Sequence, residues 1–295
     1  MEIVIAADVP TLGQNLGGES SRAGSYNGQR LLQGDAPDGL NFVFLRNQFF
    51  LKGDEAFRTP RHRHTFAQIK FVEKGSSNFA PDQFIFPGDI CYFPRGAYYG
   101  PQLKDDGTSI GMQFGFNGQH QKGKVWEGYR AEALQRLKAR GTVADGTFTE
   151  IDPVTGETQE RDGVEAIYAE QYEMHTNQKF VVPPEGYEAP ILMHPKAFSY
   201  YQAGPGVELK HLGCFYDQPG PNGDVRISMA RLSDGGVYRL SAERAQLAWT
   251  TSAGLQINGR SYPELTSLYC PRGEDGAISG ADGVEVYVVE FPRLD

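Results

Sequence analysis

RHRHTFAQIKFVEKG, residues 61–75, is the stretch that decides the fold of this 295-residue chain. Successive side chains of an extended strand point to opposite faces, so this spacing puts His62, His64 and Gln68 on one face. Neutral imidazole is a good ligand for Fe, Ni, Cu, Zn and Mn, and the amide of Gln68 offers a weaker oxygen donor. The stretch therefore predicts a strand that presents metal ligands.

A second cluster, PGDICYFPRGAYYGPQ at residues 87–102, contains a Gly-Asp turn, a short apolar strand and a Pro-x-Gly corner. Together the two stretches resemble the two sequence motifs of the cupin superfamily of small β-barrels. The positions that match these motifs in type and spacing are His62, His64, Gly75, Gly88, Pro94 and Gly96. Gln68 replaces the family's glutamate, Tyr99 replaces its last histidine, and Ala56 stands at the place of the opening glycine.

The resemblance implies a mainly β chain with two cupin-type antiparallel β-barrels, each a double-stranded β-helix or jelly roll. It also implies one divalent metal ion, with Fe as the first choice and Ni, Mn, Zn or Cu as alternatives. The expected metal ligands are His62, His64, Gln68 and Tyr99. Gln68 and Tyr99 are also the predicted catalytic residues, since they complete or tune the metal shell. A free phenol has a pKa near 10, so Tyr99 would bind as phenolate only if the metal lowered that pKa.

Turn spacing and periodicity divide the chain into three predicted parts. Short apolar runs between Gly, Asp or Pro turns predict a barrel over residues 1–122, which carries the metal site. Helical spacing of apolar residues over 125–140, and a second helical pattern from residue 163, predict a short helical insert over residues 123–190. The strand rhythm returns in residues 191–295 and predicts a second barrel.

The second barrel is predicted to be an internal repeat that has lost its metal ligands. Pro271–Gly273 repeats the Pro-Arg-Gly corner of Pro94–Gly96. Counting five residues on from Gly236 aligns two residues with the histidines, and the corner aligns a third with the last ligand. These three residues are Ala242, Arg244 and Gly276. We therefore expect packing, dimerisation or pocket closure from this half.

Substrate contacts are expected around the two motifs, and each has a plainer alternative. The predicted substrate-binding residues are Phe66, Tyr92, Arg95 and Gln102. Aromatic residues in strands are mostly core, and the repetition of Arg95 as Arg272 also fits a structural role. Arg61 and Arg63 are expected to be solvated charges on the outer strand face.

Composition limits the partners and the compartment. A formal net charge of −9 argues against nucleic acid and anionic membranes, and no hydrophobic run is long enough to cross a bilayer. The three cysteines, Cys91, Cys214 and Cys270, are not clustered, which suits buried thiols in a cytoplasmic protein, although one internal disulfide stays open. Exposed sheet edges favour a homodimer.

Two classes of function remain open at this stage. The first is a metal-dependent bicupin enzyme, dioxygenase-like in the manner of quercetinase or gentisate dioxygenase, that acts on a small oxygenated and in one version aromatic compound. The same metal as a Lewis acid would instead serve a lyase or isomerase. The second class is a metal-free barrel that binds a small molecule. A metal-free epimerase with His62 as base is a third option.

Overall fold

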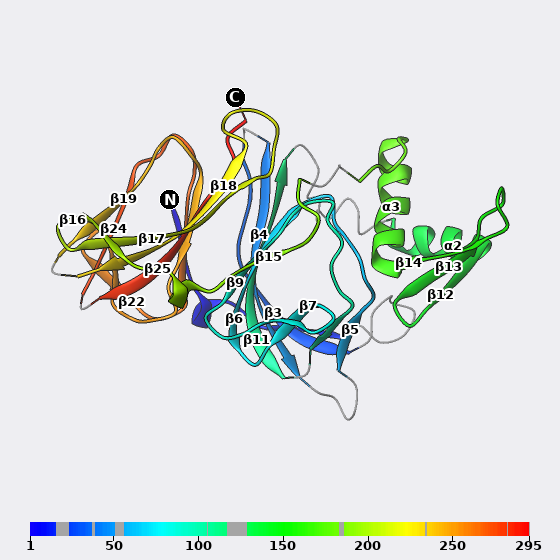
Figure 1. Ribbon diagram of the computed structural model, residues 1–295, viewed down its shortest axis with the longest axis horizontal. Helices are drawn as coiled ribbons and strands as arrows, with labels where there is room; N and C mark the ends of the chain where they lie inside the picture. The colour runs from blue at the N-terminus through cyan, green and yellow to red at the C-terminus, as the bar shows by residue number, and fades with distance from the viewer. Residues whose placement is uncertain are drawn as a thin grey trace. The chain divides into compact units, whose positions relative to one another are not determined.

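The computed structural model describes residues 1–15, 24–36, 39–50, 56–104, 106–116, 129–182, 186–233, 235–281 and 283–294. Antiparallel sheets dominate this part of the chain, which also contains two α-helices (Figure 1). The predicted fold class, mainly β with a short helical insert, is confirmed. None of the helices in the described ranges is long and apolar enough to cross a membrane.

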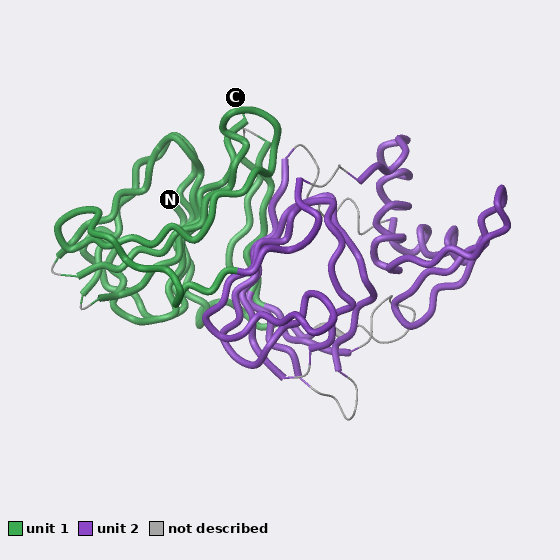
Figure 2. The backbone as a smooth tube through the Cα atoms, in the orientation of Figure 1, with its two compact units in different colours: residues 1–11, 29–45, 193–295 green, residues 12–28, 46–192 purple. Residues whose placement is uncertain are grey.

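The chain separates into two compact units (Figure 2). Unit 1 comprises residues 1–11, 29–45 and 193–295, and unit 2 comprises residues 12–28 and 46–192. Two long strands, β3 (Ser25–Asp35) and β4 (Leu40–Phe50), each have residues in both units. The boundaries predicted from sequence for the two barrels and the insert stay a prediction.

One seven-stranded sheet carries the quoted motifs. Its order is β15-β9-β6-β11-β4-β3-β2. The strands not yet defined are β2 (Leu12–Asn15), β6 (Ala67–Lys74), β9 (Ile90–Phe93), β11 (Gly107–Phe116) and β15 (Ile191–Met193). Two short sheets belong to the same unit: β5 (Phe57–Thr59) with β10 (Gln102–Lys104), and β7 (Ser77–Ala80) with β8 (Gln83–Ile85).

Apolar side chains from the large sheet and from the β7–β8 hairpin meet in the core of unit 2. This cluster comprises Val72, Phe79, Ile85, Cys91, Phe93 and Tyr99. Alternation along β6 puts Gln68 and Lys70 on the strand face that also carries Val72. The polar residues of the motif therefore share a strand face with the core.

A second seven-stranded sheet has the order β1-β23-β20-β25-β18-β17-β16. Its strands are β1 (Glu2–Ile5), β16 (Tyr201–Gly204), β17 (Val207–Tyr216), β18 (Asp224–Leu232), β20 (Gln246–Trp249), β23 (Thr266–Cys270) and β25 (Val284–Glu290). The smaller four-stranded sheet contains β19 (Val237–Leu240), β21 (Leu255–Ile257), β22 (Arg260–Tyr262) and β24 (Gly276–Gly280). Two single 3-10 turns, η1 (Ala6–Asp8) and η2 (Pro195–Ala197), complete the elements.

The two large sheets repeat one strand order, and each takes one edge strand from outside its own half of the sequence. β1, at the start of the chain, pairs with β23, whereas β15 neighbours β9 at the corresponding edge of the first sheet. Each edge strand therefore covers backbone groups that would otherwise stay unpaired.

The insert is a small α+β unit within unit 2. α2 (Arg130–Arg140) and α3 (Gly163–Thr176) pack with a three-stranded sheet of β12 (Gly141–Ala144), β13 (Thr147–Ile151) and β14 (Thr158–Asp162). Asp162 caps α3 by accepting a hydrogen bond from the backbone N–H of Glu165 at 2.8 Å. The second predicted helix is thus confirmed, while residues 125–128 of the first lie outside the described residues.

Candidate functional site

The two histidines lie just before the strand on which the sequence placed them. The prediction of one strand from Arg61 is wrong in its start, because β6 begins only at Ala67. His62 instead forms an isolated antiparallel bridge with Tyr99, with both backbone N–O distances at 2.9 Å. The backbone N–H of Gly96 donates to the His64 carbonyl at 2.8 Å. The Pro-x-Gly corner therefore fixes the segment that presents both imidazoles.

The His62 ring has a defined tautomer. The side chain is 1% exposed, and its Nδ1 atom lies 2.8 Å from the Pro60 carbonyl oxygen. A carbonyl oxygen only accepts hydrogen bonds, so Nδ1 must carry the proton and Nε2 is the basic nitrogen. This arrangement, with one ring nitrogen donating to a backbone carbonyl, is typical of histidines that bind metals.

Aromatic rings surround the two imidazoles. The His62 ring centre lies 4.2 Å from that of Tyr99 and 5.2 Å from that of His64. His64 stacks on Phe66 at 4.5 Å with an interplanar angle of 16°. The structure therefore brings Phe66, a predicted substrate contact, against a predicted metal ligand.

Gln68 and Tyr99, the other two predicted ligands, contact each other. The Gln68 amide N–H group donates to the Tyr99 phenol oxygen at 2.8 Å. Gln113, directly opposite Gln68 on β11, donates from its own amide to the Gln68 carbonyl oxygen at 3.3 Å. Both ends of the Gln68 amide are thus engaged in a short hydrogen-bonded chain inside the unit.

Sequence reasoning missed Lys70. Its Nζ atom lies 4.4 Å from the ring centre of Phe93 and 5.0 Å from that of Tyr99. Cation–π contacts of this kind hold an ammonium group against aromatic faces. The signal was available in the sequence, because Lys70 follows Gln68 by two residues and therefore shares its strand face.

The other predicted substrate residues lie in different surroundings. Tyr92 is fully buried on the opposite face of β9 from Phe93, and its ring makes an edge contact with Tyr187 at 6.2 Å. Gln102 is buried and donates to the backbone carbonyl of Asn78 at 3.0 Å. Arg95 is half-buried at the corner. These residues are not brought together with the His62–Tyr99 cluster by any contact that the structure describes.

Arg61 and Arg63 differ from the expectation of solvated charges. Their guanidinium carbons lie 4.8 and 4.6 Å from the ring centre of Tyr98. Arg63 is half-buried and forms an ion pair at 3.5 Å with Glu165 of the insert. Burial raises the pKa of the Glu165 carboxyl, although the neighbouring Arg63 charge opposes that shift. The prediction was wrong for Arg63 because its partner lies far away in the sequence.

The cysteines and the remaining described histidines lie outside the cluster or serve packing. Cys91, Cys214 and Cys270 are free thiols, and only Cys214 is exposed. Burial raises the pKa of the Cys91 thiol, while the Lys70 charge opposes the shift. His211 contacts Tyr201 and Ser228 at 2.5 and 3.2 Å. His120 lies outside the described residues.

The residues present fit a divalent metal ion in part. Two imidazoles, one with its Nε2 lone pair defined by the contact to Pro60, suit such an ion. Gln68 and Tyr99 would first have to give up the hydrogen bond that they share. Among the described residues, no three His, Cys, Asp or Glu side chains gather as a metal-binding group. The donor set as arranged is therefore His62 and His64.

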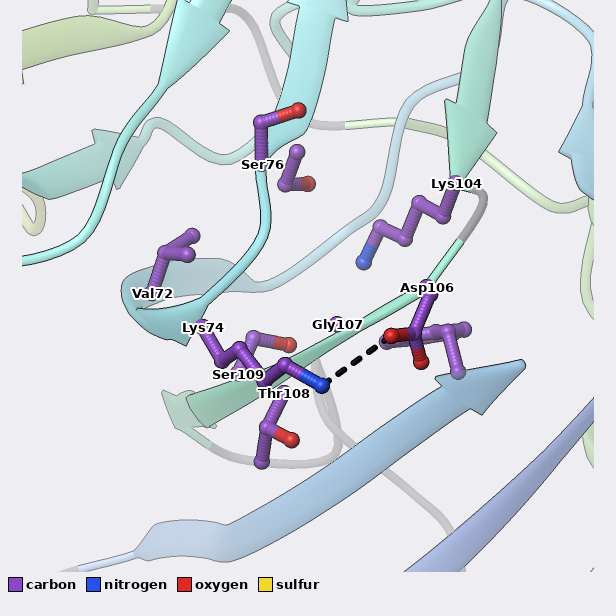
Figure 3. Close-up of a pocket in the computed structure, with 10 residues that line it drawn as sticks. Val72, Lys74, Ser76, Lys104, Asp106, Gly107, Thr108 and Ser109 are labelled. Atoms are coloured by element: carbon purple, nitrogen blue, oxygen red, sulfur yellow. Dashed lines mark hydrogen bonds and ion pairs between the residues drawn. The ribbon is translucent and has the colours of Figure 1, made fainter.

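A small hollow lies elsewhere in unit 2 (Figure 3). Its volume of about 10 Å³ is about that of one water molecule's centre, so it does not suit an organic substrate. The exposed ion pair of Lys74 and Asp106, at 3.1 Å, lies at its wall beside the buried Lys104. The Ser77 hydroxyl, also in the wall, is buried without a hydrogen-bond partner in the described structure. A single water would satisfy it.

Comparisons with known proteins give similarity at the level of structure. No model of a known protein family matches the sequence, and the search of curated proteins finds no match. A "putative dioxygenase" from Nostoc punctiforme has a TM-score of 0.58 at 12% identity, covering 99% of this chain and 83% of its own. Oxalate decarboxylase from Bacillus subtilis has a TM-score of 0.51 at 12% identity, covering 99% and 76%.

Another structure of the Bacillus subtilis oxalate decarboxylase comes from work on its Mn(II) centres, with a TM-score of 0.50 at 11% identity and coverage of 99% and 78%. Identities this low carry no argument about activity. What the likeness does show, over nearly the whole chain, is the architecture that the two motifs predicted. The chain has the fold of the two-domain cupins.

Proposed function

We propose that this protein is a cupin-fold enzyme that acts on a small oxygenated organic molecule at the His62–Tyr99 cluster of unit 2. A divalent metal ion held by His62 and His64 is part of the proposal, and it would supply Lewis acidity or a site for oxygen chemistry. The observation that carries it is the Nδ1 contact of His62 with the Pro60 carbonyl, which makes Nε2 the ligating nitrogen.

Tyr99 is the proposed proton-transfer residue. Its phenol oxygen accepts a hydrogen bond from the Gln68 amide, and a phenol that accepts one hydrogen bond still has its own proton to donate. The same amide N–H would favour the phenolate after proton loss, since a hydrogen bond to the charged form stabilises it. Gln68 is thus a positioning residue for Tyr99, and it is itself held by Gln113.

Metal content tests the proposal. We expect near-stoichiometric iron, manganese, nickel, zinc or copper in the untagged protein purified without chelator and analysed by plasma mass spectrometry. The His62→Ala/His64→Ala variant should contain less than a tenth of that metal. His211→Ala is the matched control, because His211 has hydrogen-bond partners of its own in unit 1. A parent protein that stays empty after metal is supplied would contradict the metal part of the proposal.

A second candidate function is a metal-free barrel that binds its ligand through hydrogen bonds. The observation that favours it is the Gln113–Gln68–Tyr99 chain, which engages two of the four expected ligands with each other. In that case the His62→Ala/His64→Ala variant should bind the ligand more weakly but still measurably. Full loss of binding together with loss of metal would instead favour the enzyme.

A further inference from the structure

Lys70 places a positive charge beside the proposed site. It is half-buried on the same face of β6 as Gln68, and its ammonium group rests against the rings of Phe93 and Tyr99. The cation therefore lies next to the phenol that we propose as the proton-transfer group. A cation held in partly buried surroundings attracts an anionic ligand more strongly than one in open water.

Space for such a ligand lies next to this lysine. Gly111 is directly opposite Lys70 on β11, so a side chain at residue 111 would share the Lys70 face of the sheet. A Cβ atom built on Gly111 meets no other atom within 4 Å. On the other side, the residue opposite Lys70 is Cys91 of β9. A charged group and an open position are thus neighbours across one pair of strands.

Unit 1 fills the same three places with apolar side chains. The pairing registers make Ala248 the counterpart of Lys70, with Leu268 and Val288 opposite it in place of Cys91 and Gly111. All three are buried members of the apolar core of unit 1. The strand frame is therefore satisfied without a charge and without a gap, so neither feature of unit 2 is required by the fold.

We propose that Lys70 binds the carboxylate of the ligand in the space over Gly111, and that the substrates of this protein are small carboxylic acids. The inference rests on the proposed function, because it takes the His62–Tyr99 cluster as the place where the ligand reacts. Its particular content is the charge of the ligand and the residue that recognises it. The carboxylate lies against Lys70, and the rest of the molecule extends toward the phenol of Tyr99.

Binding of matched probes tests this inference. Formate, benzoate and the uncharged benzamide are titrated by calorimetry into the full chain, both as purified and after treatment with chelator. We expect formate or benzoate to bind, and benzamide to bind at least tenfold more weakly than benzoate. Lys70→Met should lower carboxylate affinity at least tenfold and remove the preference for benzoate over benzamide, whereas Lys70→Arg should retain it.

Two further variants separate recognition from folding. Gly111→Val fills the open position and keeps the charge, so it should weaken benzoate binding without loss of thermal stability. Lys74→Met is the matched control, because Lys74 lies further along β6 and its side chain is 72% exposed in an ion pair with Asp106. It should leave every affinity unchanged.

Three results would overturn the inference: unchanged carboxylate binding in Lys70→Met, equal binding of benzoate and benzamide, or no carboxylate binding at 20 mM (about a hundredfold above the weak millimolar range that matters here). Its failure can be told apart from that of the proposed function. Selective carboxylate binding in a protein that never takes up metal would contradict only the metal site. A metal-loaded protein without that selectivity would contradict only the role of Lys70.

Discussion

The two units show how one strand frame can be filled in two ways. Gln68 is paired with Phe93, which precedes the corner at Pro94, and Gln246 is paired with Cys270, which precedes the corner at Pro271. This register makes the two glutamines counterparts. The bridge of His62 with Tyr99 then corresponds to the pair of Leu240 with Gly276.

The contents of these places differ in polarity. The proposed site residues are His62, His64, Gln68 and Tyr99, and their counterparts are Leu240, Ala242, Gln246 and Gly276. Leu240 belongs to the apolar core of unit 1, and a Cβ atom at Gly276 would lie only 2.9 Å from its Cδ1 atom. Buried polar groups are costly unless they are paired. The polar cluster of unit 2 is therefore retained for a reason other than folding.

Arg244 gives the comparison a structural counterpart. It occupies the place that Phe66 has in unit 2, is 5% exposed, and donates to the Asp224 carboxylate at 2.7 Å and to the Asp224 carbonyl at 2.6 Å. It also donates to the Phe291 carbonyl at 3.3 Å. In unit 1 a charged side chain at this place ties strands together, whereas in unit 2 an aromatic ring supports His64.

Exchanging the histidine place between the units should give the largest effect. Leu240→His puts an imidazole into the apolar core of unit 1 and should lower the free energy of unfolding by about 3 kcal/mol, since it combines lost apolar burial with an unpaired polar group. The reverse exchange, His62→Leu, removes one hydrogen bond to Pro60 and should cost about 1 kcal/mol. Urea unfolding followed by circular dichroism measures both. Equal losses would break the contrast between the units.

Removing Arg244 should give a loss of about 2 kcal/mol at neutral pH, because Asp224 stays mostly buried and keeps only Arg226 as an ion-pair partner. Burial raises the pKa of Asp224, but hydrogen bonds from Arg226 and Arg244 outweigh it and hold that pKa below its usual range. A carboxyl with a lowered folded pKa stabilises the fold above its unfolded pKa, near 4, and loses this contribution as pH falls.

The thermal midpoint of the parent should therefore fall as the pH is lowered below about 4, and that fall should be shallower in Arg244→Met. Arg226→Met is the matched control. Its side chain is 49% exposed, so its loss should be under about 1 kcal/mol. Melting curves between pH 3 and 7 decide the matter. Parallel curves for the parent and Arg244→Met would remove this ion pair from the account of unit 1.

The two glutamines should give the smallest contrast. Gln68→Leu leaves the Tyr99 phenol and the Gln113 amide each without one partner and should cost about 1.5 kcal/mol. Gln246→Leu removes a bond to the Ser241 carbonyl, but it also removes an amide oxygen that is buried without a partner among the described residues. We expect a change near zero. A loss as large as that of Gln68→Leu would show that unit 1 also depends on its glutamine.

Sequence alone identified the fold and the two histidines, because strand alternation and corner spacing are local properties. Its alignment of the second half was wrong by two residues. It matched Ala242 and Arg244 to the histidines, whereas Gly273 donates to the Ala242 carbonyl as Gly96 does to that of His64. Counting from a turn glycine assumes equal loop lengths, and only strand pairing reveals that the lengths differ.

Other features divide by how far apart in the chain their parts lie. The place of Lys70, and the position of Tyr92 on the opposite face from Phe93, follow from alternation and were within reach of the sequence. The contact of Arg63 with Glu165 joins segments that no local pattern connects. The same holds for the hydrogen bond between Gln68 and Gln113, which depends on the register of β6 and β11.

The exchange of edge strands has a consequence for synthesis on the ribosome. The sheet with the proposed site can be completed once β15 has left the exit tunnel, roughly two thirds of the way through translation. β1 is made first, yet its partner β23 is among the last segments to appear. Until then β1 is a strand with unsatisfied backbone groups, the kind of segment that chaperones shield from aggregation. The nascent chain thus completes its reactive half before its packing half.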